Sequence, residues 1–104
     1  MNPPVSVRVG PHTYRLVMVP DGVMDDAGRV GHCCPERLVI ALDSGQRPSQ
    51  LADTILHELV HALLRSVDLE SAEEERVCLA LGPGLLALVR DNPSLVAWLT
   101  RSTL

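Results

Sequence analysis

The sequence predicts an α+β domain in which a short antiparallel sheet packs on a long helix and is followed by C-terminal helices. Strand-like alternation of apolar and polar residues is confined to residues 5–42, and helical periodicity takes over after residue 48. The chain has 104 residues, 46% hydrophobic and 21% charged, which is the composition of a globular protein. We therefore expect a single domain spanning residues 1–104.

The strand signals lie in the N-terminal part of the chain. Apolar and β-branched residues alternate with polar ones over residues 5–9 and 14–19, and a Gly-Pro turn between them predicts a hairpin. Residues 23–31 contain two aspartates and two glycines and are expected to form a loop. The strongest strand signal is the apolar run at residues 37–42, which we expect to be an edge strand, paired on one side only.

A long amphipathic helix is predicted at residues 49–67, with Ser49 as its N-cap. At 100° per residue its apolar side chains cover one broad face, and the polar side chains, both histidines included, lie opposite. A second helix begins among three glutamates at residues 73–75, where negative charge suits the positive end of the helix dipole.

The C-terminal part of the chain is also predicted to be helical. Gly82-Pro83-Gly84 is expected to interrupt or kink the second helix, which resumes over residues 85–90. Asn92-Pro93 has the pattern of an N-cap followed by proline at the first helical position, and a last helix is expected to run through Trp98. The apolar segment 85–104 is a candidate surface for homodimerisation.

Charge and composition argue against several classes of function. The net charge is −4, with nine arginines, no lysine and no basic run, so nucleic acid and anionic membranes are not expected partners. No apolar run approaches the roughly 18 to 20 residues of a membrane span, and no secretory leader is recognisable. We expect a cytoplasmic protein whose three cysteines are reduced, two of them being adjacent and poorly placed to pair.

The sequence His57-Glu58-Leu59-Val60-His61 is the pattern with the clearest chemistry. Two histidines four residues apart on a helix stand one turn from each other, where both can bind one zinc ion. Glu58 projects about 100° around the helix from His57, beside the metal, where it can deprotonate a metal-activated water. These positions predict His57 and His61 as metal ligands and Glu58 as the general base of a hydrolase.

The alternative is that these three residues lie on the solvent face of a helix and have no function. A shuffled chain with the same histidine and glutamate content would contain the pattern roughly 0.01 times, so chance is a poor explanation. The strand at residues 38–42 favours a peptidase further, because such enzymes hold extended substrates against an edge strand.

A catalytic zinc site usually has three protein ligands, so a third must come from elsewhere in the chain. No histidine follows His61, and acidic side chains are the candidates. We favour Glu74 because apolar residues three, four and seven positions later place it on the buried side of its helix. Glu75 and Glu73, turned by about 100° either way, stay open as alternatives.

The segment 57–64, the pair Glu74-Glu75 and the segment 85–93 resemble the minimal zincin-like metallopeptidases found in phage and prophage genomes, and more loosely the ImmA/IrrE-type metallopeptidases. The resemblance extends from about residue 38 to the C-terminus and is most specific at the five-residue zinc motif. It implies a small zincin-like fold, zinc on His57 and His61, Glu58 as the catalytic carboxylate, an acidic third ligand on the next helix, and a protein or peptide substrate.

Other residues leave alternatives open. His32 or Tyr14 are candidates to stabilise an oxyanion, although packing is the simpler role of both. Arg65, one turn after His61, is placed to hold a carboxylate or to lie on the surface. A second class of function is a non-catalytic, metal-stabilised protein-binding module, in which the metal joins two helices and a surface recognises a partner.

Overall fold

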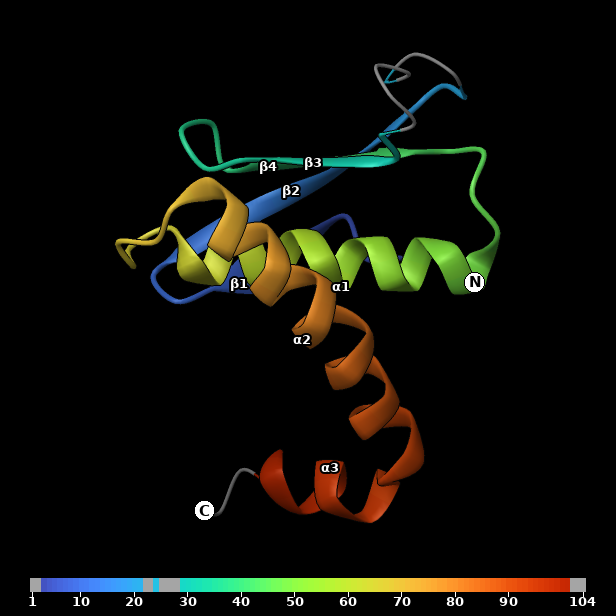
Figure 1. Cartoon of the computed structure of the whole chain (residues 1–104). Coiled ribbons are helices and arrows are strands. Elements are labelled where there is room, and N and C mark those ends of the chain that lie inside the picture. The colour runs from blue at the N-terminus through green and yellow to red at the C-terminus, as the bar shows by residue number, and fades with distance from the viewer. Residues whose placement is uncertain (1–2, 22–23, 25–28, 102–104) are drawn as a thin grey trace.

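The computed structural model describes residues 3–21, 24 and 29–101. A four-stranded mixed sheet is followed by three helices, and the first helix packs on one face of the sheet (Figure 1). The elements, in chain order, are β1 (Ser6–Val9), β2 (His12–Val19), β3 (Gly31–Cys34), β4 (Val39–Asp43), α1 (Pro48–Leu64), α2 (Ser71–Asp91) and α3 (Pro93–Leu99). The α+β class predicted from the sequence is confirmed.

The N-terminal hairpin forms as predicted. β1 and β2 pair antiparallel, with Val9 opposite His12, so the connecting loop has two residues. Gly10 has a φ of 58°, and Pro11 follows it with a φ that its ring holds negative, which matches a type II′ turn. Glycine accepts the positive φ at no steric cost, and this fixes the register of the hairpin.

The sequence predicts an antiparallel sheet, but the sheet in the structure is mixed. Its strand order is β1-β2-β4-β3, and β2 pairs with β4 in parallel, with Arg15 opposite Val39. The reason is β3, a strand that the sequence did not predict, which forms an antiparallel hairpin with β4 through a tight turn. That turn places Leu38 at a φ of 55°. After this turn the chain runs back as β4, which lies beside β2 and in the same direction.

The strand at residues 37–42 was expected to lie at an edge, and this is wrong. It corresponds to β4, which pairs with β2 on one side and with β3 on the other. The edge strand on this side of the sheet is β3, which pairs with β4 alone among the described strands, and β1 forms the opposite edge. Of the loop expected at residues 23–31, Gly31 opens β3, and residues 23 and 25–28 lie outside the described residues.

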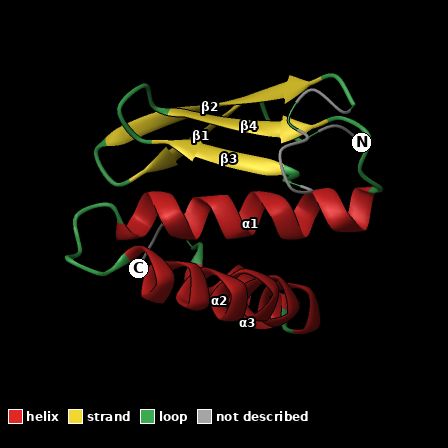
Figure 2. Cartoon of the chain, turned by 45° about the horizontal axis from the view of Figure 1, so that its top comes forward, coloured by secondary structure: helices red, strands yellow, loops and turns green. Residues whose placement is uncertain are grey.

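The core lies between the sheet and α1. Alternate residues of β2 and β4 face the helix, as period-two strands require. The fully or almost fully buried members of this core are Tyr14, Leu16, Ile40, Leu42 and Ala62. Figure 2 shows the sheet, α1 and α2 as successive layers, so α1 is covered on two sides. Within the described residues, no helix combines the length and the apolarity that a bilayer crossing requires.

The helices differ from the prediction at two ends and in one interior. α1 spans Pro48–Leu64, and its N-cap is Arg47, whose backbone N–H donates to Gln50 Oε1 at 3.2 Å, so Ser49 is not the cap. α2 runs without a break from Ser71 to Asp91, although Pro83 lies inside it. Of the expected interruption or kink, the interruption is wrong, and Gly82, one of the two buried positions of the helix, packs closely against α1 at this point. α3 begins at Pro93 with Asn92 at the N-cap, as predicted.

Candidate metal centre

α1 supplies two histidines that face a groove between secondary-structure elements. His57 and His61 are one turn apart, and their ring centroids lie 5.0 Å from each other. Because α1 is sandwiched between the sheet and α2, the imidazoles are largely enclosed, with 18% and 22% of their side chains exposed. The polar side of the predicted amphipathic helix is thus the lining of a groove.

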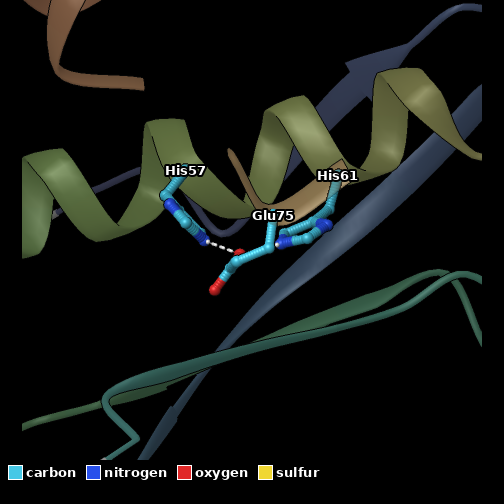
Figure 3. Close-up of side chains that lie close together, drawn as sticks. All are labelled: His57, His61 and Glu75. Carbon is cyan, nitrogen blue, oxygen red and sulfur yellow. Dashed lines mark hydrogen bonds and ion pairs between the residues drawn. The ribbon is translucent and has the colours of Figure 1, made fainter. Parts of the chain in front are cut away.

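α2 brings a carboxylate to both rings. Glu75 Oε1 lies 2.8 Å from His57 Nε2 and 2.9 Å from His61 Nε2 (Figure 3). One potential ligand atom from each of the three residues lies within 4.8 Å of the other two. Imidazole nitrogens and a carboxylate oxygen are donors that divalent metal ions such as zinc use, and three protein donors leave a coordination position free. The group His57, His61 and Glu75 can therefore hold a metal ion.

Glu74 occupies a different place from the one expected from the sequence. Its Oε2 lies 2.6 Å from Nδ1 of His61, on the side of the ring that faces away from Glu75. The structure therefore brings Glu75, rather than Glu74, to the two Nε2 atoms, and Glu73 is exposed outside the group.

The rotation of α2 explains this difference. The sequence favours Glu74 partly because it predicts that Leu81, seven residues later, is buried, but Leu81 is 45% exposed. The buried positions of α2 are Cys78 and Gly82, three and seven residues after Glu75. The spacing of Cys78 and Gly82 from Glu75 is visible in the sequence, but a glycine next to a proline predicts a helix break and not a packing position.

Glu58 is buried beside the group formed by His57, His61 and Glu75, between α1 and β3. Glu58 is 8% exposed. A Cβ atom at Gly31 of β3 would lie 3.1 Å from Oε2 of Glu58. Burial raises the pKa of Glu58, and this effect outweighs the neighbouring His61 and His57, which act in the opposite direction. A carboxylate with a raised pKa is a better proton acceptor near neutral pH than an ordinary glutamate.

The contacts around His61 and Glu75 shift the pKa values of these two side chains. Burial disfavours the charged form of His61, but hydrogen bonds to Glu74 and Glu75 raise its pKa overall. Burial acts against ionisation of Glu75 as well, and the hydrogen bonds and charges of His61 and His57 nevertheless lower its pKa. In the metal-free protein the charged forms of His61 and Glu75 therefore stabilise each other.

The group lies in a groove that continues on both sides of it. A cavity of about 650 Å³ reaches past His57 to Leu79 and Pro83 on α2. A second cavity of about 600 Å³ reaches past His61 to Arg65 and Ser71. Both cavities share His32, Glu58 and His61, among others, and residues of β3 line each of them. One wall of the groove is therefore the edge strand.

His32, Tyr14 and Arg65, the other candidate site residues from the sequence, lie in three different places. His32 lines the groove, but it alternates along β3 with Gly31 and Cys33, which face α1. Tyr14 is fully buried in the core and is not among the residues that line the two groove cavities, so an oxyanion role for it has no geometric support. Arg65 lies at one end of the groove, where its Nη1 donates to the carbonyl of Pro35 at 3.2 Å.

The cysteines are not part of the metal-binding group. All three are free thiols. Burial, assisted by nearby carboxylates, raises the pKa of Cys33 and of Cys78 to about 12. Because thiolate is the form that attacks an electrophile, these two residues are poor nucleophiles.

Comparisons of the chain with protein-family models, with curated proteins and with solved structures found no match. The functional inference therefore depends on the geometry of the site itself.

Proposed function

We propose that the protein is a zinc-dependent hydrolase, and specifically a small metallopeptidase of the zincin-like kind. The observation that carries the proposal is the convergence of His57, His61 and Glu75 beside the buried carboxylate of Glu58. The spacing of the two histidines and Glu58, followed by an acidic residue on the next helix, matches the ligand and base arrangement of such enzymes.

Each side chain has a distinct role in this proposal. His57, His61 and Glu75 would hold the zinc ion, which supplies Lewis acidity to a water and to the substrate carbonyl. Glu58, which is beside the donors and not among them, accepts the proton from the attacking water. It then returns that proton to the departing amine.

The groove supports an extended polypeptide as the substrate. The groove passes the site on both sides. β3 pairs with β4 along one side, and the backbone N–H and C=O groups on its other side pair with no strand of the described residues. An extended peptide can add to such an edge through main-chain hydrogen bonds. If a cleaved peptide is N-methylated at one backbone nitrogen at a time, cleavage should therefore be abolished when the methyl group is at every second residue, and should persist when it is at the residues between.

The decisive variant is Glu58→Gln, which keeps the shape of the side chain and removes the base. We expect its rate of peptide hydrolysis to fall by at least roughly 100-fold with zinc affinity unchanged. Zinc content and cleavage of a peptide library, followed by mass spectrometry, measure the two effects. Glu73→Gln, at an exposed position of α2, is the matched control and should resemble the wild type. Full activity of Glu58→Gln would reject this mechanism.

A non-catalytic, metal-stabilised binding module is the second candidate. It is favoured by the fact that the donors join α1 to α2, and by exposed apolar side chains on α3 such as Trp98 and Leu99. This candidate predicts four protein ligands and no free coordination position, which X-ray absorption on the zinc-loaded protein distinguishes.

A further inference from the structure

Near its N-terminus, α2 places two consecutive glutamates beside the two nitrogens of one imidazole. Glu75 Oε1 is 2.9 Å from Nε2 of His61, and Glu74 Oε2 is 2.6 Å from Nδ1. Consecutive residues on a helix are turned by about 100°, so the two carboxylates approach the ring from different sides. The ring of His61 lies between them.

This arrangement determines which nitrogen of His61 is available to a metal. A neutral imidazole carries its proton on one nitrogen and coordinates through the other, and an acceptor at one nitrogen fixes the proton there. Glu74 supplies that acceptor at Nδ1. Glu75 faces Nε2, but the same Glu75 oxygen also meets Nε2 of His57, so the two Nε2 atoms converge on one place where an ion can bind both. Nε2 is therefore the nitrogen of His61 placed to coordinate, and the proton is left on Nδ1, facing Glu74.

Glu74 and Glu75 also differ in their exposure and in the part of the groove that each one lines. The side chain of Glu74 is 26% exposed, whereas that of Glu75 is 51% exposed at the open side of the group. Glu74 lines the groove cavity on the Arg65 side and is absent from the lining of the cavity that contains all three donors. Glu74 therefore touches the donor group through His61.

We propose that Glu74 is a positioning residue: it accepts a hydrogen bond from Nδ1–H of His61 and so directs Nε2 toward the metal, without being a ligand itself. This inference rests on the proposed metal site. It assigns to one helical turn both a ligand and the group that orients another ligand.

The test compares zinc affinities, measured by competition with a chromophoric chelator, for the wild type and four variants. Glu74→Leu removes the acceptor, and we expect zinc affinity to fall by about 10- to 100-fold. Glu74→Gln keeps an amide oxygen that accepts the same Nδ1–H, and it should retain most of the affinity. Glu75→Leu should lose more than Glu74→Leu, and Glu73→Leu, a matched control at an exposed position, should lose nothing.

A spectroscopic readout separates positioning from ligation. The cobalt-loaded Glu74→Leu protein should keep the visible absorption spectrum of the wild type, because its ligand set is unchanged, whereas Glu75→Leu should alter that spectrum. In the zinc-loaded wild type, the Nδ1–H proton of His61 should give a strongly downfield NMR signal that Glu74→Leu shifts upfield.

Three results would overturn the assignment in distinguishable ways. Equal zinc affinities of Glu74→Leu and Glu73→Leu would show that Glu74 has no role. A cobalt spectrum altered by Glu74→Leu as strongly as by Glu75→Leu would show that Glu74 is a ligand. A wild-type protein that binds neither zinc nor cobalt would overturn the proposed function, and this assignment with it.

Discussion

At the scale of single residues, Gly31 leaves room for the buried carboxylate of Glu58. A Cβ atom at this position would lie 2.5 Å from Cγ2 of Thr54 and 3.1 Å from Oε2 of Glu58. Both contacts are closer than van der Waals packing allows, so a larger residue would force α1 and β3 apart or displace the two side chains. The missing side chain at position 31 is therefore part of what positions Glu58.

Gly31→Ala, alone and combined with Thr54→Ser, tests this role. The serine removes the Cγ2 atom and keeps the hydroxyl, which donates to the Gln50 carbonyl at 2.9 Å. We expect Gly31→Ala to lower the free energy of unfolding by about 1–3 kcal/mol, and Thr54→Ser to restore most of it. The double variant should still hydrolyse peptides more slowly at unchanged zinc affinity, because Glu58 stays crowded. Urea denaturation and steady-state kinetics measure both, and a fully active double variant contradicts the role.

At the scale of elements, the site depends on how closely α2 crosses α1. A Cβ atom at Gly82 would lie 3.1 Å from both the Cα and the backbone N of His57. The closest neighbours are backbone atoms, which cannot rotate away. Gly82 therefore sets the separation of the two helices at the turn that carries His57, and the same helix carries Glu75.

Gly82→Ala should push α2 away from α1, with Gly84→Ala as the matched control. A Cβ atom at Gly84 meets nothing within 4 Å, so this substitution should stabilise the helix by up to about 1 kcal/mol. Gly82→Ala should instead destabilise the fold by about 1–3 kcal/mol and weaken zinc binding, because Glu75 moves relative to the histidines. Thermal denaturation and chelator competition decide between them, and equal behaviour of the two alanine variants would contradict the close crossing.

The ion pairs between α1 and α2 predict a pH-dependent stability of the metal-free protein. The lowered pKa of Glu75 contributes stability that is present above its unfolded value of about 4.3 and is lost as pH falls through the folded pKa. The raised pKa of His61 contributes stability that is present below about 6.5 and is lost as pH rises through the folded pKa.

The difference in melting temperature between the wild type and Glu75→Gln, both in chelator, isolates this contribution. It should be largest between about pH 4.3 and 6.5 and should decline on both sides. Its size should correspond to about 1 kcal/mol or less, because the carboxylate is half exposed and solvent screens it. A difference that does not vary between pH 3 and pH 9 would show that these pairs do not form in solution.

At the scale of the whole molecule, α3 and the second half of α2 extend away from the sheet (Figure 1). The radius of gyration is 14.3 Å, against about 13 Å for a compact chain of this length. α3 packs on α2 and, within the described residues, on no other element. Exposed apolar side chains on this arm are Leu88, Val89, Leu95, Trp98 and Leu99. The homodimer expected from segment 85–104 stays a prediction, which analytical ultracentrifugation tests.

Metal binding should stabilise the entire fold, because its donors join α1 to α2. Free zinc at 100 times the dissociation constant adds about 2.7 kcal/mol to the free energy of unfolding. For a domain of this size, the melting temperature should rise by roughly 10–20 °C. Differential scanning calorimetry with zinc and with chelator measures the change, and the variant His57→Ala/His61→Ala should show none. An unchanged melting temperature of the wild type would mean that the three donors hold no zinc.

Features that depend on local spacing can be predicted from the amino-acid sequence. The hairpin around Gly10, the α+β order of the elements, and the helical turn that brings His57 and His61 together all follow from periodicity and turn chemistry within a few residues. A spacing of four residues on a helix places two side chains on one face wherever that helix lies.

The carboxylate that joins the two histidines, and the strand that borders the groove, depend on long-range packing. Glu74 and Glu75 are consecutive residues near the N-terminus of α2. The choice between them depends on the rotation of that helix about its axis, which is set by the contact of Gly82 with His57. In the same way, β3 became the edge strand because β4 pairs in parallel with β2, a partner distant in sequence. Such contacts join residues that local patterns treat independently, so their outcome is fixed only when the layers pack together.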